Sequence, residues 1–246
     1  MKIIGHRGMI SKGPENSRES ILHAIQNFDG VEIDIVQLAS GELLVMHDFT
    51  LERTTINCSQ YLCDNKLQTL NWNQISHVKL LNNEPPLCLD EVFFILNDYN
   101  GKTKDVFIEI KCPITNIEKL FETINILKNT SIKHHLISFE IDLIINFRDI
   151  FSLNLDTKYH LLCNDAIHIN KYKYFMQMID TATKYKLDGI QFISDPTIIT
   201  PEIVKCALDN DLLVTTWVNS AIANSNTEQT IQYMKDIGVD FFTGNV

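Results

Sequence analysis

Long apolar segments are absent from this sequence. No uninterrupted apolar run reaches the roughly 18 residues that a transmembrane helix requires. The most apolar stretch, residues 136–151, is interrupted by Glu140, Asp142 and Arg148. The N-terminal apolar segment is too short for a signal peptide and lacks a small-residue cleavage site. We therefore expect no stable insertion into a membrane, and a cytoplasmic location.

Basic residues are scarce. Lysine and arginine number 21 against 31 aspartate and glutamate residues, which gives a formal net charge of −10 at pH 7. A protein that binds nucleic acid usually needs a basic surface, and docking on an anionic membrane needs a basic cluster. The charge balance argues against both partners. An anionic substrate would need local cations or a metal to offset the overall field.

The cysteines show no metal-binding spacing. None of the six forms a C-x-x-C pair, the arrangement typical of a zinc ribbon. Four of them lie beside apolar residues in segments that we expect to be buried. We interpret the cysteines as buried, reduced thiols of an intracellular protein.

Short apolar runs alternate with longer helical segments along the whole sequence. At 246 residues, with 45% hydrophobic and 21% charged residues, the chain can bury a large core. The alternation predicts an α/β fold, a (β/α)8 TIM barrel, as one domain spanning residues 1–246. The predicted strands are residues 2–5, 31–34, 106–110, 136–139, 159–163, 190–193, 213–218 and 240–243. The predicted helices are residues 17–28, 90–98, 116–128, 142–151, 173–185, 201–210 and 227–236.

One connection is too short for a crossover between parallel strands. Residues 32–36 and 43–46 both resemble strands, but only six residues with a Ser-Gly turn separate them. A parallel crossover needs about a dozen residues or more, so the second strand must return antiparallel to the first. That return would bring His47 back towards Glu32 and Asp34.

The residues at about 49–87 interrupt the alternation. They are rich in asparagine, glutamine and leucine and only weakly periodic, and more than 30 residues pass before the next predicted helix. Long excursions within a compact domain are usually functional lids or small subdomains. We expect a small insertion after the second strand.

Charged side chains follow the predicted strands. The active site of a (β/α)8 barrel lies at the carboxyl ends of its strands. The pairs Glu32-x-Asp34 and Glu109-x-Lys111 each lie on one face of a strand, because side chains alternate, and their neighbours are apolar. The charged face therefore points into the barrel. Three carboxylates there either bind a cation or share protons and pair with Arg7 and Lys111. Oxygen ligands favour Mg²⁺ or Ca²⁺.

Cationic and titrating side chains accompany the carboxylates. Arg7 and Lys111 would supply positive charge to an anionic group such as a phosphate. His6 and His47 are the groups here that titrate near neutral pH without special shifts. This set suits displacement at a phosphodiester, in which one histidine activates the nucleophile and the other protonates the leaving alkoxide. A metal would stabilise charge on the phosphoryl oxygens.

Several short motifs follow each other in a characteristic order. They are Gly5-His6-Arg7-Gly8, Pro14-Glu15-Asn16-Ser17, Glu32-Ile33-Asp34, Gly41-x5-His47-Asp48, Leu51-x-Arg53-Thr54-Thr55, Pro86-Leu87-x-Leu89-x-Glu91-Val92, Glu109-Ile110-Lys111 and Thr216-Trp217-x-Asn219. Together they resemble the glycerophosphodiester phosphodiesterase family over nearly the whole chain. The resemblance implies a (β/α)8 barrel that uses a divalent cation to hydrolyse glycerophosphodiesters to an alcohol and sn-glycerol 3-phosphate.

The resemblance also implies a role for each site residue. By themselves, Glu15 could cap a helix, Lys111 could pair with a carboxylate and Trp217 could pack in the core. The resemblance implies Glu32, Asp34 and Glu109 as ligands of one divalent cation, Mg²⁺ or Ca²⁺, and His6 and His47 as the catalytic acid–base pair. It implies that Arg7 and Lys111 bind the phosphate, that Glu15 orients neighbouring site groups, and that Trp217 lines the glycerol or head-group side.

The end of the sequence departs from the family pattern. Thr243-Gly244-Asn245-Val246 stands where the family usually has Thr-Asp-x-Pro, so the acidic residue of that motif is missing. The sequence given also stops there, which leaves one flank of the predicted barrel without an outer helix. Either the N-terminal segment or a second subunit would cover that flank. The sequence therefore leaves open whether the protein forms a homo-oligomer.

Three functions fit the predicted barrel. The first is a metal-dependent glycerophosphodiester phosphodiesterase acting on a small-molecule substrate. The second is a phospholipase D-type enzyme of the same barrel acting on lysophospholipids or sphingomyelin, although such enzymes are typically secreted and disulfide-linked. The third is a non-catalytic barrel that binds a glycerophosphodiester. The complete set of histidines and carboxylates favours the first. The sequence does not decide which head group is released or whether Mg²⁺ or Ca²⁺ is bound. It also leaves open whether water or the substrate's own hydroxyl attacks phosphorus.

Overall fold

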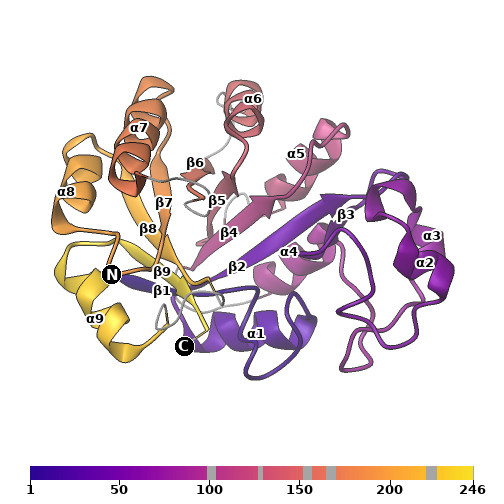
Figure 1. Ribbon diagram of the computed structural model, residues 1–246. Helices are drawn as coiled ribbons and strands as arrows, with labels where there is room; N and C mark the ends of the chain where they lie inside the picture. Colours follow the sequence, from indigo (N-terminus) through magenta and orange to yellow (C-terminus); the bar gives the residue numbers. More distant parts are fainter. Residues whose placement is uncertain (99–103, 127–129, 152–156, 165–169, 220–225, 246) are drawn as a thin grey trace.

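Eight parallel strands close into a barrel in the computed structural model (Figure 1). The structure describes the chain except residues 99–103, 127–129, 152–156, 165–169, 220–225 and 246. The strand order is β1-β9-β8-β7-β6-β5-β4-β2, and β1 pairs with β2 to close the ring. The predicted (β/α)8 fold is confirmed. The barrel strands are β1 (Lys2–Gly5), β2 (Gly30–Gln37), β4 (Asp105–Ile110), β5 (Lys133–Ser138), β6 (Thr157–Leu162), β7 (Gly189–Ile193), β8 (Leu213–Trp217) and β9 (Phe241–Gly244).

A ninth strand, β3 (Leu43–Val45), lies outside the barrel and pairs antiparallel with β2. Ile35 lies opposite Val45, and the amide of Met46 donates a hydrogen bond to the carbonyl of Asp34 at 3.0 Å. The predicted hairpin is therefore confirmed. Because the chain turns back instead of crossing over, the residue after Met46 returns to the end of β2.

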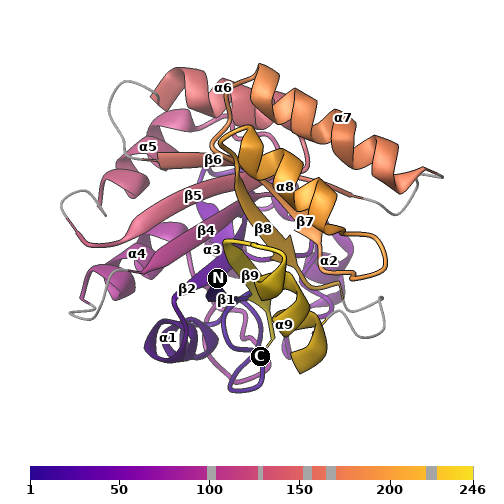
Figure 2. The ribbon, with the colours of Figure 1, turned by 90° about the vertical axis from the view of Figure 1, so that its left-hand side faces the viewer.

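The helices surround the strands (Figure 2). Several begin where an oxygen side chain caps the first turn: Ser17, Asn116 and Thr227 each accept a hydrogen bond from the amide three residues later. The helices between barrel strands are α1 (Arg18–Asn27), α4 (Leu89–Asn97), α5 (Ile117–Asn125), α6 (Ile141–Phe151), α7 (Lys171–Lys184), α8 (Pro201–Asp209) and α9 (Glu228–Asp236). Among the described residues, no helix combines the length and the hydropathy that crossing a bilayer requires.

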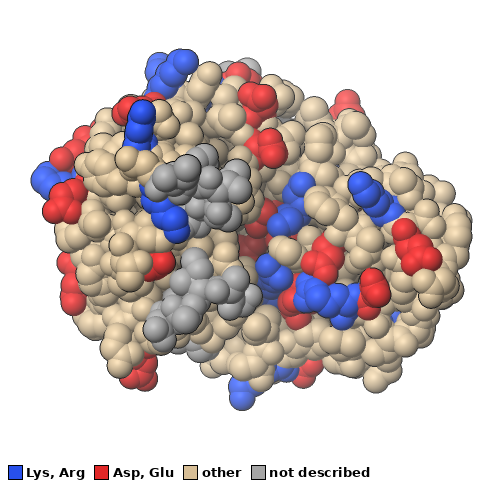
Figure 3. Space-filling model, viewed as in Figure 1, with Lys and Arg blue, Asp and Glu red and all other residues tan. Residues whose placement is uncertain are grey.

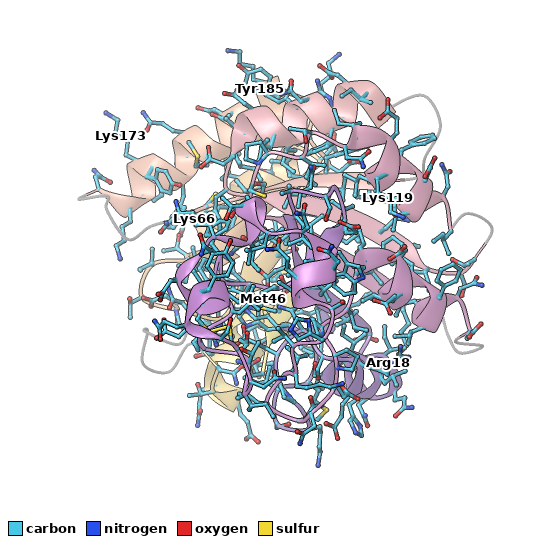
Figure 4. All side chains as sticks on the ribbon, turned by 90° about the vertical axis from the view of Figure 1, so that its right-hand side faces the viewer. Arg18, Met46, Lys66, Lys119, Lys173 and Tyr185 are labelled. Atoms are coloured by element: carbon cyan, nitrogen blue, oxygen red, sulfur yellow. A yellow bond between two sulfur atoms is a disulfide. The ribbon has the colours of Figure 1, made fainter. Side chains whose placement is uncertain are left out.

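The insertion is a small helical unit with its own apolar core. It contains α2 (Gln60–Asp64), the 3₁₀ turn η1 (Leu67–Thr69) and α3 (Trp72–Ile75), which lie beyond β3 at one side of the barrel (Figure 1). Figure 4 views the molecule from this side, with Met46 near the middle. These helices are too short for a helical repeat of apolar residues to be recognised in the sequence. Their core joins both arms of the hairpin to the insertion through Val36, Leu38, Leu44, Met46, Leu51, Leu62, Leu67, Leu70, Ile75, Val78 and Leu80.

The interpretation of all cysteines as buried, reduced thiols is wrong for one pair. Cys58 and Cys63 form a disulfide with their Cα atoms 5.9 Å apart, a separation typical of disulfides. The pairing arises because Ser59, the residue after Cys58, caps α2, and Cys63 lies in the first turn of that helix. Among the described residues, Cys88, Cys112 and Cys163 are free and buried.

A buried polar network lies near the amino ends of the barrel strands. His135 Nδ1 lies 2.9 Å from His160 Nε2, His135 Nε2 lies 3.0 Å from Asp105 Oδ1, and Lys2 Nζ donates to Asp105 Oδ2 at 2.5 Å. The ring of Phe107 stacks on His135 with 4.2 Å between centroids. Burial lowers the pKa of His160 well below its usual value, and His135 lowers it further. Burial also lowers the pKa of His135, despite the opposing effect of Asp105.

These lowered pKa values predict a loss of stability in mild acid. Below about pH 6.5 an unfolded histidine takes up a proton that folded His160 does not, so the free energy of unfolding falls by about 1.4 kcal/mol per pH unit for this group. The variant His160→Gln keeps a polar atom near Nε2 but does not titrate. We expect chelator-treated wild-type protein to lose stability relative to this variant between about pH 6.5 and 5. Urea unfolding at each pH measures the free energy of unfolding of both proteins. A difference between the two values that stays constant from pH 6.5 to 5 would contradict this prediction.

Candidate active site

Three carboxylates meet inside the barrel on β2 and β4. The strand ladder places Asp34 opposite Glu109, and Glu32 precedes Asp34 on the same face of β2. One oxygen from each of the three carboxylates lies within 4.8 Å of the others. Glu32 is 3% exposed and Asp34 is 0% exposed, and Ile33 between them packs in the outer core. The alternation predicted from the sequence therefore brings the expected acidic cluster together.

Burial and mutual repulsion perturb the ionisation of this cluster. Burial raises the pKa of Glu32 well above its usual value, and the charges of Asp34 and Glu109 raise it further. Burial and the charge of Asp34 raise the pKa of Glu109 to about 7. Burial would also raise the pKa of Asp34, but Lys111 and Arg7 outweigh it and hold that pKa below its usual value. Full ionisation of all three carboxylates therefore calls for more positive charge than the side chains supply.

The donor set fits a single divalent cation. Asp34 Oδ1 is buried and accepts no hydrogen bond from the described residues. The separation of at most 4.8 Å between the carboxylate oxygens suits oxygens bound to one ion at about 2.1 Å for Mg²⁺ or 2.3–2.6 Å for Ca²⁺. Five carboxylates face three cationic side chains here, a formal charge of −2 that one divalent cation would offset. They are Glu15, Glu32, Asp34, Asp48 and Glu109 against Arg7, Arg53 and Lys111.

A sharp turn after β1 attaches the first motif to the cluster. Arg7 and Gly8 have positive φ angles of 54° and 91°, and the amide of Arg7 donates to Glu32 Oε2 at 2.8 Å. A Cβ atom on Gly8 would lie 2.4 Å from Ser20 Oγ, so a side chain does not fit there. The amide of Asn16 closes the turn by donating to the carbonyl of Arg7 at 2.8 Å. The strained backbone at Arg7 is held by hydrogen bonds on both sides.

The two predicted phosphate-binding residues lie beside the carboxylates. Lys111 Nζ is 2.8 Å from Glu109 Oε1 and 3.5 Å from Asp34 Oδ1. Arg7 Nη1 is 3.1 Å from Glu15 Oε1, and Arg7 Nε is 3.6 Å from Asp34 Oδ2. Burial would lower the pKa of Lys111, but Glu109 and Asp34 outweigh it and raise that pKa. Lys111 is therefore charged, and both Lys111 and Arg7 are paired with carboxylates in this structure.

The two predicted catalytic histidines line one cavity with the acidic cluster. His6 follows β1 and His47 follows β3, and both border a cavity of about 110 Å³ together with Glu32. Burial, reinforced by the charge of Arg7, lowers the pKa of His6 to about 4. Burial also lowers the pKa of His47. His47 Nδ1 lies 2.7 Å from Asp48 Oδ1, which places a proton on Nδ1 and leaves Nε2 free to accept one.

A chain of ion pairs ties the insertion to the site. Arg53 Nε donates to Asp48 Oδ2 at 2.6 Å, and its two terminal nitrogens donate to the oxygens of Glu15 at 2.6 and 2.7 Å. The hydrogen bond from Arg53 lowers the pKa of Asp48 to about 2. Burial would raise the pKa of Glu15, but Arg53 and Arg7 outweigh it and lower that pKa. Glu15 thus accepts hydrogen bonds from both arginines.

The site cavity continues into a wider outer pocket of about 420 Å³. His6, Arg7, His47 and Trp217 border both spaces. The Trp217 ring meets the ring of Phe139 edge to face, with 5.9 Å between centroids. In the space-filling view, acidic and basic side chains lie together at and beside a hollow near the middle of the face (Figure 3). Trp217 therefore lines both spaces, and its place on the glycerol or head-group side stays a prediction.

The fold brings to the site four residues for which the sequence predicts no role there. Asn16 Nδ2 donates to Asp34 Oδ2 at 2.9 Å, and Arg53 bridges Asp48 and Glu15. Gln191 and Thr243 line the 110 Å³ cavity. Asn16 and Arg53 belong to the quoted motifs, but their partners are decided by tertiary packing. For Gln191 the sequence offers one signal, a polar residue within an apolar strand.

The arrangement is suited to chemistry on an anionic group. Arg7 and Lys111 can attract the anion, and the carboxylates can hold a cation beside it. The two imidazoles are neutral near pH 7, because their pKa values are lowered. One neutral imidazole can accept a proton while the other delivers one.

Comparisons with known proteins identify relatives of this chain. The model of the Glycerophosphoryl diester phosphodiesterase family matches residues 6–245. A Glycerophosphodiester phosphodiesterase from Bacillus altitudinis is 36% identical over 77 residues, which are 31% of this chain and 31% of that protein. The sequence alignment with this curated relative therefore spans about a third of its length.

Solved structures share the fold over the whole barrel. A phosphodiesterase from Oleispira antarctica, in complex with the product sn-glycerol-3-phosphate, is 17% identical with a TM-score of 0.76, covering 100% of this chain and 93% of that chain. A glycerophosphodiester phosphodiesterase from Agrobacterium tumefaciens is 18% identical with a TM-score of 0.75, covering 100% of this chain and 96% of that chain. At these identities the likeness establishes the fold.

Proposed function

Because the chain belongs to the glycerophosphoryl diester phosphodiesterase family, we propose that it hydrolyses glycerophosphodiesters to an alcohol and sn-glycerol 3-phosphate with the help of one divalent cation. One observation carries this proposal. His6, His47, Arg7 and Lys111 border a single cavity with two of the three clustered carboxylates. Acid–base groups, phosphate-binding cations and metal ligands are thereby available to the same substrate.

Glu32, Asp34 and Glu109 would hold the cation, either Mg²⁺ or Ca²⁺. When bound, the ion would offset charge on the phosphoryl oxygens. With the charge of the cluster neutralised, Lys111 and Arg7 would be released from part of their pairing with the carboxylates. They can then bind the phosphate oxygens through charge-assisted hydrogen bonds. Glu15 keeps Arg7 in place, because it accepts hydrogen bonds from both Arg7 and Arg53.

The two histidines would move the protons. One imidazole takes a proton from the attacking oxygen, and the other gives a proton to the leaving alkoxide. Asp48 fixes the orientation of His47 through Nδ1, so Nε2 is the atom that exchanges a proton. Trp217 and Phe139, whose rings meet edge to face, supply apolar surface to the cavity beside these groups.

Release of sn-glycerol 3-phosphate from glycerophosphocholine tests this function. We expect release with Mg²⁺ or Ca²⁺ and no release with a chelator, because the acidic cluster needs a cation to bind an anionic substrate. Turnover should return when either ion is restored. Equal rates with ion and with chelator would overturn the metal requirement while leaving the hydrolysis itself in place.

No release from a folded protein with either ion would favour the other two functions. Lysophosphatidylcholine and sphingomyelin, assayed for choline release, test the phospholipase D-type alternative. The Cys58–Cys63 disulfide removes one argument against that alternative, since those enzymes are typically disulfide-linked. Binding of glycerophosphocholine without turnover of any of these substrates would support a non-catalytic barrel.

A further inference from the structure

The wall of the 110 Å³ cavity opposite the acidic cluster contains a buried polar group that the catalytic roles above do not use. Gln191 lies on β7 and is 1% exposed, and it borders the cavity. Its Nε2 atom has no hydrogen-bond partner among the described residues. Thr243 on β9 borders the same cavity, is 2% exposed, and has an equally unpartnered Oγ1. Buried donors without partners are costly, so their persistence here points to a ligand that completes them.

Apolar side chains also line the cavity that Gln191 borders. Ile137 and Leu162 border the same part of the cavity, and Leu162 pairs directly with Gln191 in the strand ladder. Phe192, next in the chain, faces away into the outer core. Gln191 and Thr243 add uncharged polar contacts at defined points of a cavity whose other polar groups are charged or are imidazoles.

The topology fixes where these contacts lie relative to the acidic cluster. Around the closed ring, β7 is four strands from β2 in either direction, so Gln191 faces Glu32 and Asp34 across the barrel. One of the two substituents of a phosphodiester held at the cluster could therefore extend towards β7, and we assign the glycerol moiety to that side. In a glycerol 3-phosphoryl group, the atom that reaches furthest from phosphorus is the hydroxyl on C1.

We propose that Gln191 is a specificity-determining residue that hydrogen-bonds the C1 hydroxyl of the substrate's glycerol moiety, with Thr243 as a second contact. The inference rests on the proposed function. The amide of Gln191 would contact substrate but no reacting atom, so it acts through binding and orientation. It would let the enzyme distinguish glycerol phosphodiesters from diesters whose alcohol lacks this terminal hydroxyl.

A substrate pair that differs by one hydroxyl tests the proposal. The first is glycerophosphocholine, and the second is 2-hydroxypropyl phosphocholine, which keeps the C2 hydroxyl but has hydrogen in place of the C1 hydroxyl. We expect wild-type kcat/KM to be about 10- to 100-fold lower for the second substrate, because a site built to bind a hydroxyl rejects the analogue that lacks it. The variant Gln191→Met should lose this preference, mainly through a higher KM for glycerophosphocholine. Its kcat/KM for the deoxy substrate should be higher than that of the wild type, because methionine leaves no unpaired amide beside the missing hydroxyl.

Controls separate this result from misfolding and from failure of the proposed function. Gln232→Met changes an exposed glutamine on α9 and should keep the full preference. Melting curves with added sn-glycerol 3-phosphate offer a second measurement: the ligand should stabilise the wild type more than Gln191→Met or Thr243→Val. If wild-type protein does not turn over glycerophosphocholine, the proposed function fails. If it does, and Gln191→Met keeps the wild-type preference for the C1 hydroxyl, the role of Gln191 is overturned.

Discussion

Replacing His6 or His47 by glutamine is expected to lower kcat on glycerophosphocholine by about 10²- to 10⁴-fold, the contribution typical of general acid–base catalysis. Glutamine keeps polar atoms in the cavity but exchanges no proton near neutral pH. Both histidines border the cavity that contains Glu32, and their lowered pKa values keep them neutral at pH 7. Initial rates of sn-glycerol 3-phosphate release at saturating metal measure the effect.

His77→Gln provides the matched control, because His77 is an exposed residue of the insertion that borders neither site pocket. Its kcat should equal that of the wild type. The losses in His6→Gln and His47→Gln should appear in kcat more than in KM, since proton transfer belongs to the transition state. A folded His6→Gln protein with wild-type kcat would exclude His6 from catalysis.

The change Glu32→Gln is expected to raise the Mg²⁺ or Ca²⁺ concentration for half-maximal activity by at least about 100-fold. Loss of a group that merely supports a metal ligand costs about 10- to 100-fold, and Glu32 is proposed as a ligand itself. Without metal, the variant should melt at a higher temperature than the wild type. Its amide replaces a carboxylate whose pKa is raised by burial and by repulsion from Asp34 and Glu109. Melting curves in chelator and in each ion give this readout independently of activity.

Glu202→Gln on α8 provides the matched control, because this carboxylate is fully exposed and remote from the cluster. It should leave both the metal requirement and the melting temperature without metal unchanged. If added Mg²⁺ or Ca²⁺ raises the melting temperature of Glu32→Gln as much as that of the wild type, Glu32 is not a ligand.

Two of the three carboxylates in the acidic cluster could be placed together from the sequence because their spacing is local. Side chains alternate along a strand, so Glu32 and Asp34 share a face whatever the rest of the chain does. The length of the link after β2 then requires a hairpin, and the hairpin returns His47 to the same end of the barrel. Both inferences need only strand periodicity and loop length.

Contacts that cross from one element to another could not be predicted in this way. Arg53 and Glu15 are 38 residues apart, and they meet because the leucine-rich core of the insertion folds against the hairpin. The Cys58–Cys63 pair depends on where α2 begins. Each of these contacts is set by packing between segments whose sequence patterns are weak.

The sequence by itself determined the barrel, the hairpin and the identity of the charged residues at the carboxyl ends of its strands. Those features follow from short-range rules of periodicity, alternation and connection length. Only the tertiary structure decided which side chains face one another across the barrel. Closure of the ring set Gln191 on β7 opposite Glu32 on β2. No pattern within either strand encodes this placement, because it depends on every strand between them.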